Sequence, residues 1–158
     1  MTPPRRPSWE QNYSARLRFE RAAYIAYPSI WRSTTGHRKY ARVVYRVLVP
    51  VHGYEPRTVE MHFRRTTPEP DVTRVYTDGP TESPHRYAPQ RKDSLRRPSL
   101  CIWYHDDPLE RRWVPSDGLL TLIEMTRVHL FKEAYYRETG QWLGEEVSHH
   151  HQPRSKTC

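Results

Sequence analysis

The sequence predicts an α+β fold in which a helix precedes an antiparallel sheet and a longer helix follows it. Three observations predict this class: helical spacing over residues 14–27, alternating polar and apolar residues between 38 and 77, and a strong helical pattern over 116–139. A chain of 158 residues has the length of one domain. We expect that domain to span residues 14–148, with a flexible N-terminal segment at 1–13 and a disordered tail at 149–158.

The first helix is predicted from the apolar spacing after Ser14, which is a suitable N-cap residue. The spacing places Leu17, Tyr24 and Ile25 near one face, which we expect to be the buried face. Pro28 is expected to end the helix, because proline cannot continue the hydrogen-bond ladder.

Three strands are predicted over residues 39–50, 57–65 and 71–80, with turns near Pro50–Gly53 and at Asp78-Gly79. Strict alternation indicates that each strand buries one side and exposes the other, as in an antiparallel meander. The side chains expected to point inward are Ala41, Val43, Tyr45, Val47, Val49, Val59, Met61 and Phe63, and those expected to point outward are Glu60, His62 and Arg64.

An irregular segment at residues 81–98 contains three prolines, and long loops of this kind in a compact domain are often functional. A short apolar run at 99–104 follows, and a turn at 106–108 ends it. The last helix is expected from about Ser116 to Thr139, with Gly140 ending it. Its predicted apolar stripe consists of Leu119, Leu120, Ile123, Leu130, Phe131, Ala134 and Tyr135.

Cys101 lies in the short apolar run and is the only cysteine besides the terminal Cys158. One interpretation is a small buried apolar side chain, which is how most isolated cysteines behave. The other is a nucleophile placed where a strand meets a loop. Two cysteines do not form a disulfide framework, and a cytoplasmic setting would keep the thiol reduced. Nearby cations such as Arg96, Arg97 and a protonated His105 would favour the thiolate if the fold brings them close.

The net charge of +8 raises the possibility of nucleic-acid binding. The cations are spread along the whole chain without a basic tail, however, and 22 of the 26 are arginine, which a biased genome composition also explains. Neither a signal-peptide core nor an apolar run long enough to span a membrane is present, so we expect a cytoplasmic protein without a membrane partner.

Three short motifs occur in the order found in ubiquitin-conjugating enzymes: Pro84-His85, Leu100-Cys101, and Trp113-Val114-Pro115 ahead of the last helix. The chain more closely resembles the ubiquitin-conjugating-like proteins of bacterial CBASS anti-phage operons, of the short type II that lacks a fused activating domain. The resemblance covers about residues 83–149. Two features depart from the family: the usual His-Pro-Asn triplet is absent, and the segment between Cys101 and Trp113 is longer.

The resemblance implies a ubiquitin-conjugating (UBC-like) fold with Cys101 as the catalytic cysteine of a thioester-forming transferase. It implies that the acyl donor is the C-terminal tail of a cGAS-like nucleotidyltransferase (CD-NTase), with protein lysines as acceptors and no cofactor or metal. His85 is the candidate oxyanion donor, and Trp113 and Pro115 form a structural motif. The candidates for deprotonating the incoming amine are His105, Asp106 and Asp107. The scarcity of lysine suits such an enzyme, because few internal amines could capture its acyl group.

Two other functions remain open from the sequence. The chain could be a non-catalytic binding module of the same fold, which the missing asparagine favours and the retained Cys101 disfavours. It could also be a basic nucleic-acid-binding protein with a structural cysteine, although no RNA-recognition aromatic motif or basic helix is visible. The histidine tract at 149–151 is interpreted as part of a polar tail and not as a metal site.

Overall fold

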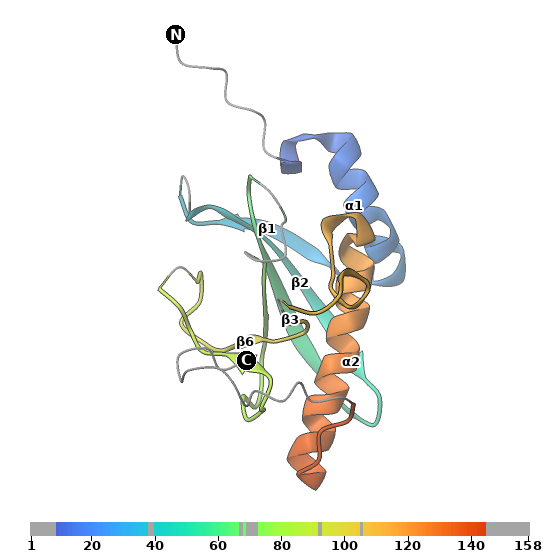
Figure 1. Ribbon diagram of the computed structural model, residues 1–158. Coiled ribbons are helices and arrows are strands. Elements are labelled where there is room, and N and C mark those ends of the chain that lie inside the picture. Colours follow the sequence, from blue (N-terminus) through green and yellow to red (C-terminus); the bar gives the residue numbers. More distant parts are fainter. Residues whose placement is uncertain are drawn as a thin grey trace.

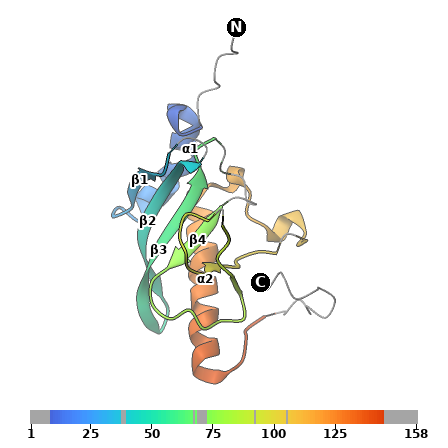
Figure 2. The same ribbon diagram turned by 90° about the vertical axis from the view of Figure 1, so that its left-hand side faces the viewer.

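A computed structural model describes residues 9–37, 40–66, 68, 73–91, 93–104 and 106–144, so the tail with its histidine tract lies outside it. Of the segment predicted to be flexible at 1–13, residues 1–8 also lie outside it, whereas residues 9–11 form a short helix with Glu10 buried. The fold is mixed α+β, as predicted: two helices cover one face of a four-stranded antiparallel sheet, and an extended segment crosses the other face (Figures 1 and 2). The elements are η1 Trp9–Gln11, α1 Tyr13–Ala26, β1 Trp31–Thr35, β2 Arg42–Val51, β3 Tyr54–Arg64, β4 Arg74–Thr77, β5 Arg86–Tyr87, β6 Ser99–Leu100, η4 Leu109–Arg111, η5 Pro115–Asp117 and α2 Gly118–Thr139.

The sheet has the order β1-β2-β3-β4, and every neighbouring pair is antiparallel. All eight side chains that alternation placed inward, on β2 and β3 and just before β2, are buried, which confirms the predicted inner face. The sequence prediction missed β1, because WRSTT is a mostly polar edge strand without an alternating buried side. It also missed β5, which lies inside the segment predicted to be irregular and pairs with β6 at the start of the apolar run at 99–104.

The helix α1 differs from its prediction in both its cap and its buried face. Asn12, not Ser14, is the N-cap, and its Oδ1 accepts a hydrogen bond from the backbone N–H of Ala15 at 3.1 Å. Leu17 and Ile25 are 42% and 72% exposed, while the buried residues are Phe19, Glu20 and Ala23. Glu20 can be buried because its carboxylate accepts a hydrogen bond from the Tyr45 hydroxyl at 2.7 Å.

The helix α2 begins at Gly118, after the single turn of η5, and ends at Gly140, whose φ of 75° confirms the predicted glycine stop. The predicted apolar stripe is correct for Leu119, Ile123 and Leu130, which are buried. The rest of the buried face differs, because polar residues take several of its positions. The full buried set of α2 is Leu119, Leu122, Ile123, Thr126, His129, Leu130 and Glu133.

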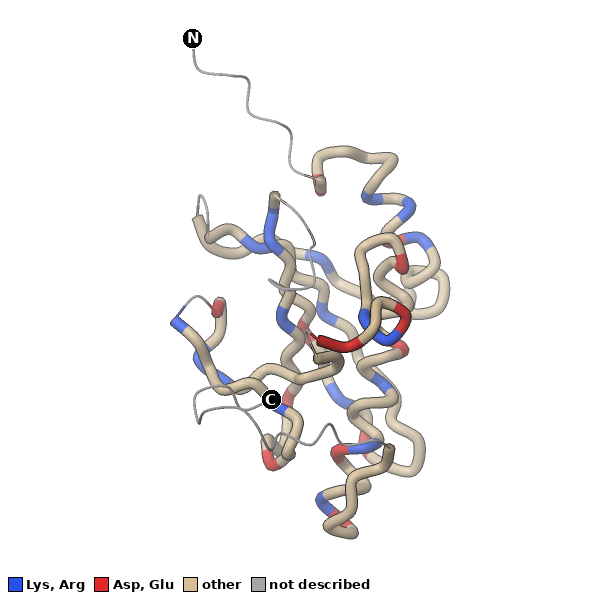
Figure 3. Tube along the Cα trace, in the orientation of Figure 1, with Lys and Arg blue, Asp and Glu red and all other residues tan. Residues whose placement is uncertain are grey.

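Positive charge is distributed over both helices and the sheet, as the tube in Figure 3 shows, and is not concentrated at one end. Many of these cations are paired, for example Arg46 with Glu60 on neighbouring strands and Arg65 with Glu10 beneath η1. Among the described residues, no helix is both long enough and apolar enough to cross a membrane.

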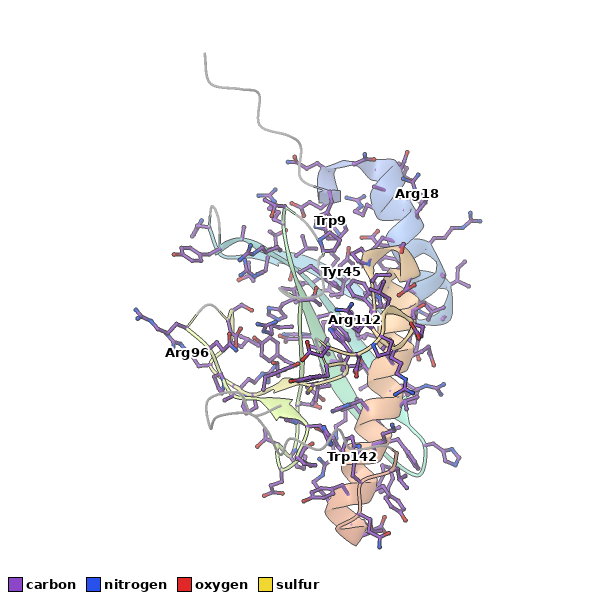
Figure 4. All side chains as sticks on the ribbon, viewed as in Figure 1. Trp9, Arg18, Tyr45, Arg96, Arg112 and Trp142 are labelled. Carbon is purple, nitrogen blue, oxygen red and sulfur yellow. The ribbon has the colours of Figure 1, made fainter. Side chains whose placement is uncertain are left out.

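Aromatic rings fill the space between the sheet and the helices. The ring of Trp113 is fully buried between Phe19, Phe63 and Trp103, with centroid distances of 5.8–6.2 Å. Its indole N–H donates to the carbonyl oxygen of Gly118 at 2.9 Å, which fixes the first turn of α2. Trp9 and Tyr45, labelled in Figure 4, also pack against Phe19 and Phe63. The Trp113–Pro115 motif is therefore structural, since Pro115 opens η5 directly before α2.

Candidate active site around Cys101

The β5–β6 pair brings Cys101 next to His85. Arg86 pairs with Leu100 and Tyr87 with Ser99, so the residues before β5 and after β6 meet at the same end. The backbone N–H of Cys101 donates to the carbonyl oxygen of His85 at 3.0 Å. Two residues that are far apart in the sequence are therefore held by one backbone hydrogen bond, at a position set by the strand register.

A cavity of about 470 Å³ lies beside Cys101, between the chain that leaves β6 and the helix α2. Cys101 is only 7% exposed, but it lines this cavity, and its sulfur lies 3.6 Å from the carbonyl oxygen of Trp103. The lining consists of His85, Cys101, Ile102, Trp103, Tyr104, Asp107, Thr121, Glu124, Met125, Val128, His129, Lys132 and Trp142.

The structure holds Cys101 as a disulfide and not as a free thiol. This differs from the reduced state that the composition led us to expect. The other cysteine of the chain, Cys158, lies outside the described residues. Nucleophilic chemistry at Cys101 therefore requires that a reductant first release its thiol.

His85 has an aromatic neighbour that the motif analysis did not place beside it. Its imidazole packs against the indole of Trp142, with the centroids 4.1 Å apart and the planes inclined by 38°. His129 contacts the same indole edge-on at 5.5 Å. Trp142 follows the end of α2, where Figure 4 labels it, and it forms one wall of the cavity. The chain after α2 thus positions the imidazole of His85.

A buried ion pair joins β5 to α2 next to the cavity. Arg86 donates from Nε to Glu133 Oε1 at 2.9 Å and from Nη2 to Oε2 at 2.6 Å, while Glu133 is fully buried. His129 Nε2 and Arg137 Nη1 lie 3.4 and 3.6 Å from the same carboxylate. Burial alone would raise the pKa of Glu133, but His129 and Arg86 outweigh it and lower this pKa to about 2. The pair fixes Arg86, and therefore the adjacent His85, against α2.

Of the two candidates for the general base that the structure describes, Asp107 lines the cavity and Asp106 does not. The Oδ2 of Asp107 accepts a hydrogen bond from the backbone N–H of Tyr104 at 2.8 Å, so its carboxylate also stabilises the local turn. Asp106 is exposed and does not line the cavity, and His105 lies outside the described residues. Sequence reasoning missed Glu124, which lines the cavity from α2 and accepts a hydrogen bond from the Tyr27 hydroxyl at 2.8 Å.

The arginines before β6 do not reach the cavity. Arg97 lies over the Tyr76 ring at 5.5 Å, and its Nη2 is 3.7 Å from Glu60, both on the sheet face opposite the helices. Arg96, labelled in Figure 4, is exposed beside it. The cation that does line the cavity is Lys132, the only lysine among the described residues. The proposal that Arg96 and Arg97 activate the thiol is therefore not supported.

Within the described residues, no three side chains of histidine, cysteine, aspartate or glutamate gather closely enough to hold a metal ion. The cavity is instead lined by aromatic and aliphatic side chains with a few polar groups, an arrangement that suits a peptide or small organic group. No family model, curated protein or solved structure matches this chain.

Proposed function

We propose that the chain has a UBC-like fold and acts as a cysteine-dependent transferase, forming a thioester between Cys101 and the C-terminus of a cGAS-like nucleotidyltransferase in CBASS anti-phage defence. The observation that carries this proposal is the shared cavity of Cys101 and His85, held together by the Cys101 N–H to His85 O hydrogen bond. The element order, a meander followed by Cys101, Trp113-Val114-Pro115 and a long helix, supports the fold. The identity of the partner rests on the resemblance of residues 83–149.

The first chemical step forms a carbon–sulfur bond. The reduced Cys101 thiolate attacks an activated C-terminal carbonyl, an adenylate or a thioester, because a free carboxylate is not electrophilic. The leaving group departs with its electron pair, and the thiol proton passes to solvent or to a base. The carbonyl oxygen carries negative charge in the tetrahedral intermediate, and the imidazole of His85, on the same cavity wall, is the side chain suited to donate a hydrogen bond to it.

The second step passes the acyl group to an amine. The amine nitrogen attacks the thioester, the carbon–nitrogen bond forms, the carbon–sulfur bond breaks, and the Cys101 thiolate leaves. The amine must lose a proton, for which Asp107 and Glu124 are the carboxylates that line the cavity. Trp103, Met125 and Val128 give the cavity apolar walls that limit water at the thioester.

The test is intact-mass analysis of the chain co-expressed with its nucleotidyltransferase. A phosphine reductant first opens the disulfide without cleaving thioesters, and a thiol is then added to half of the sample. We expect an adduct that the thiol removes, that is absent from Cys101→Ala, and that becomes a thiol-resistant ester in Cys101→Ser. An adduct that persists unchanged in Cys101→Ala would end the claim that Cys101 is the nucleophile.

Lys132 requires a matched control in this experiment. It is a primary amine on the wall of the same cavity, so an amide on Lys132 would also resist the thiol. Lys132→Arg keeps the charge and removes the nucleophilic amine. A thiol-resistant adduct that disappears in Lys132→Arg is internal transfer, whereas a thiol-sensitive adduct that survives this change is the Cys101 thioester.

The second candidate function is a binding module of the same fold that performs no chemistry. Two observations favour it: the low exposure of Cys101 and its disulfide state. Both functions require that Cys101→Ala still bind the partner, so binding does not separate them. Adduct formation does, because only the transferase gives a thiol-sensitive mass shift after reduction.

A further inference from the structure

Three arginines gather on the face of the sheet that is turned away from the helices. Arg42 of β2 and Arg64 of β3 are direct cross-strand partners, so their side chains leave the same face at the same position. Arg74 of β4 pairs with His62, two residues along β3 from Arg64, and so lies diagonally across from it. The three side chains form a cluster, the Arg42–Arg64–Arg74 cluster, that is separate from the Cys101 cavity.

The positive charge of this cluster is only partly neutralised by the described residues. Asp93 pairs with Arg74, whose Nε lies 3.0 Å from Oδ1. Arg42 is 7% exposed, and within the described chain its guanidinium bonds only the carbonyl oxygen of Ala41, at 3.2 Å. The Nε of Arg64 is buried without a hydrogen-bond partner there. Among the described residues, Asp93 is thus the carboxylate that pairs with this group of three arginines.

Such an arrangement is costly unless an anion is bound. Like charges at directly opposed cross-strand positions destabilise a sheet, and a buried guanidinium needs a partner to replace its lost hydration. Burial lowers the pKa of Arg42, and the neighbouring charges of Arg64 and Arg74 lower it further, although Tyr76 and Asp93 act in the opposite direction. An anion bound at this position would offset both the repulsion between the guanidinium groups and the loss of their hydration.

We propose that the Arg42–Arg64–Arg74 cluster binds a phosphate group. A phosphate dianion is attracted by neighbouring guanidinium groups, and its oxygens accept hydrogen bonds from such groups in pairs. The site is reachable, because Arg64 is only partly buried and the side chain of Arg74 is 23% exposed. The ligand is either free phosphate or the phosphate of a nucleotide, since both present the same chemistry. The proposal does not depend on the chemistry at Cys101.

The test measures thermal unfolding and calorimetric binding of the full chain with sodium phosphate, using sodium chloride at equal ionic strength as the reference. At a phosphate concentration ten times Kd we expect Tm to rise by about 3–5 °C above the chloride reference. Arg64→Gln and Arg42→Gln should each weaken phosphate binding at least tenfold. Two variants are used because Arg42 is buried and its replacement could affect folding by itself.

The matched control is Arg18→Gln, which removes the same charge from the exposed face of α1 and should leave the phosphate response unchanged. A parallel arm with AMP identifies the source: tighter binding of AMP than of phosphate supports a nucleotide site, and equal binding supports a site for phosphate alone. A wild-type Tm that rises no more in phosphate than in chloride would overturn the proposal. An equal rise in Arg64→Gln and wild type would do the same.

Discussion

The backbone carbonyl of His85 holds the Cys101 N–H, while its side chain packs on Trp142 and faces the cavity. The two roles can be separated, because a change of side chain leaves the backbone hydrogen bond in place. His85→Ala should therefore preserve the position of Cys101 and remove only the imidazole. If the ring donates to the oxyanion, the transfer rate should fall by about ten- to a thousandfold.

The measurement is single-turnover transfer from the Cys101 thioester to a free amine, with Tm recorded for each variant. Trp142→Leu is the control, because it removes the ring contact with His85 and keeps the imidazole. It should lower Tm through lost packing while reducing the rate less than His85→Ala does. Equal rates for wild type and His85→Ala would mean that the imidazole takes no part in the reaction.

At the level of single residues, the sequence predicts part of the candidate active site. Motif order placed Cys101 and His85 in one region, and the β5–β6 register puts them in contact. The motif order did not indicate Trp142 as the partner of His85, because it reaches the cavity through the path of the chain after Gly140, which no local period encodes. Glu133 was missed because a polar residue on a helix is expected to be exposed, and only its pairing with Arg86 explains its burial.

The Arg86–Glu133 pair connects the short β5 strand to α2, and a pair of strands this short has few hydrogen bonds of its own. Glu133→Gln removes the charge that compensates Arg86, whose side chain is 4% exposed. Removing one partner of a buried pair leaves an uncompensated charge, so we expect this variant to lose about 3 kcal/mol of unfolding free energy. Urea unfolding measures this loss.

The double variant Arg86→Met with Glu133→Leu is the control, because it removes both charges and fills the space with apolar groups. It should recover most of the stability that Glu133→Gln loses. If the single variant were as stable as the wild type, the pair would not hold β5 to the helix. In that case the fixed position of His85 would need another cause.

The same carboxylate predicts how stability depends on pH. Glu133 has a pKa of about 2 in the folded chain against an ordinary value of 4.5, so the unfolded chain binds a proton at higher pH than the folded chain does. Its contribution is therefore complete above pH 4.5 and is lost as pH falls from 4.5 towards 2, by about 3 kcal/mol in total. Urea unfolding at pH 5 and pH 3 should show a drop for wild type that is smaller in Glu133→Gln. Equal drops would assign the acid sensitivity to other groups.

Among whole elements, the strands that bury one face were the most predictable. Alternation placed every inward residue of β2 and β3 correctly, because a period of two is needed to bury one side of a sheet. His62 was predicted to point outward and does so, yet it is only 3% exposed. Its Nδ1 lies 2.6 Å from the Ser94 hydroxyl in the segment that crosses this face. Because the segment that buries His62 is distant in the sequence, the local alternation of β3 does not predict this burial.

For the molecule as a whole, the charge of +8 is spread over the surface and partly neutralised within it (Figure 3). Arg32 and Arg65 both meet the carboxylate of Glu10, for example, so these cations are not free to form a stripe along a nucleic-acid backbone. A distributed positive field is better suited to steering an acidic protein partner. Such steering acts mainly on the association rate and weakens as salt screens the charges.

Salt dependence therefore separates a protein partner from nucleic acid. We expect the association rate with the nucleotidyltransferase to fall between 50 and 200 mM salt while the dissociation rate changes little, as measured by stopped-flow fluorescence. Duplex DNA of arbitrary sequence should bind only weakly and with a shallow salt dependence. A protein that contacts several phosphates would instead show a steep log–log slope of affinity against salt. Fluorescence anisotropy over the same range measures that slope. Tight binding of arbitrary duplexes that collapses as salt rises would show that the paired arginines open to meet phosphates, and nucleic acid would then replace a protein as the partner of this surface.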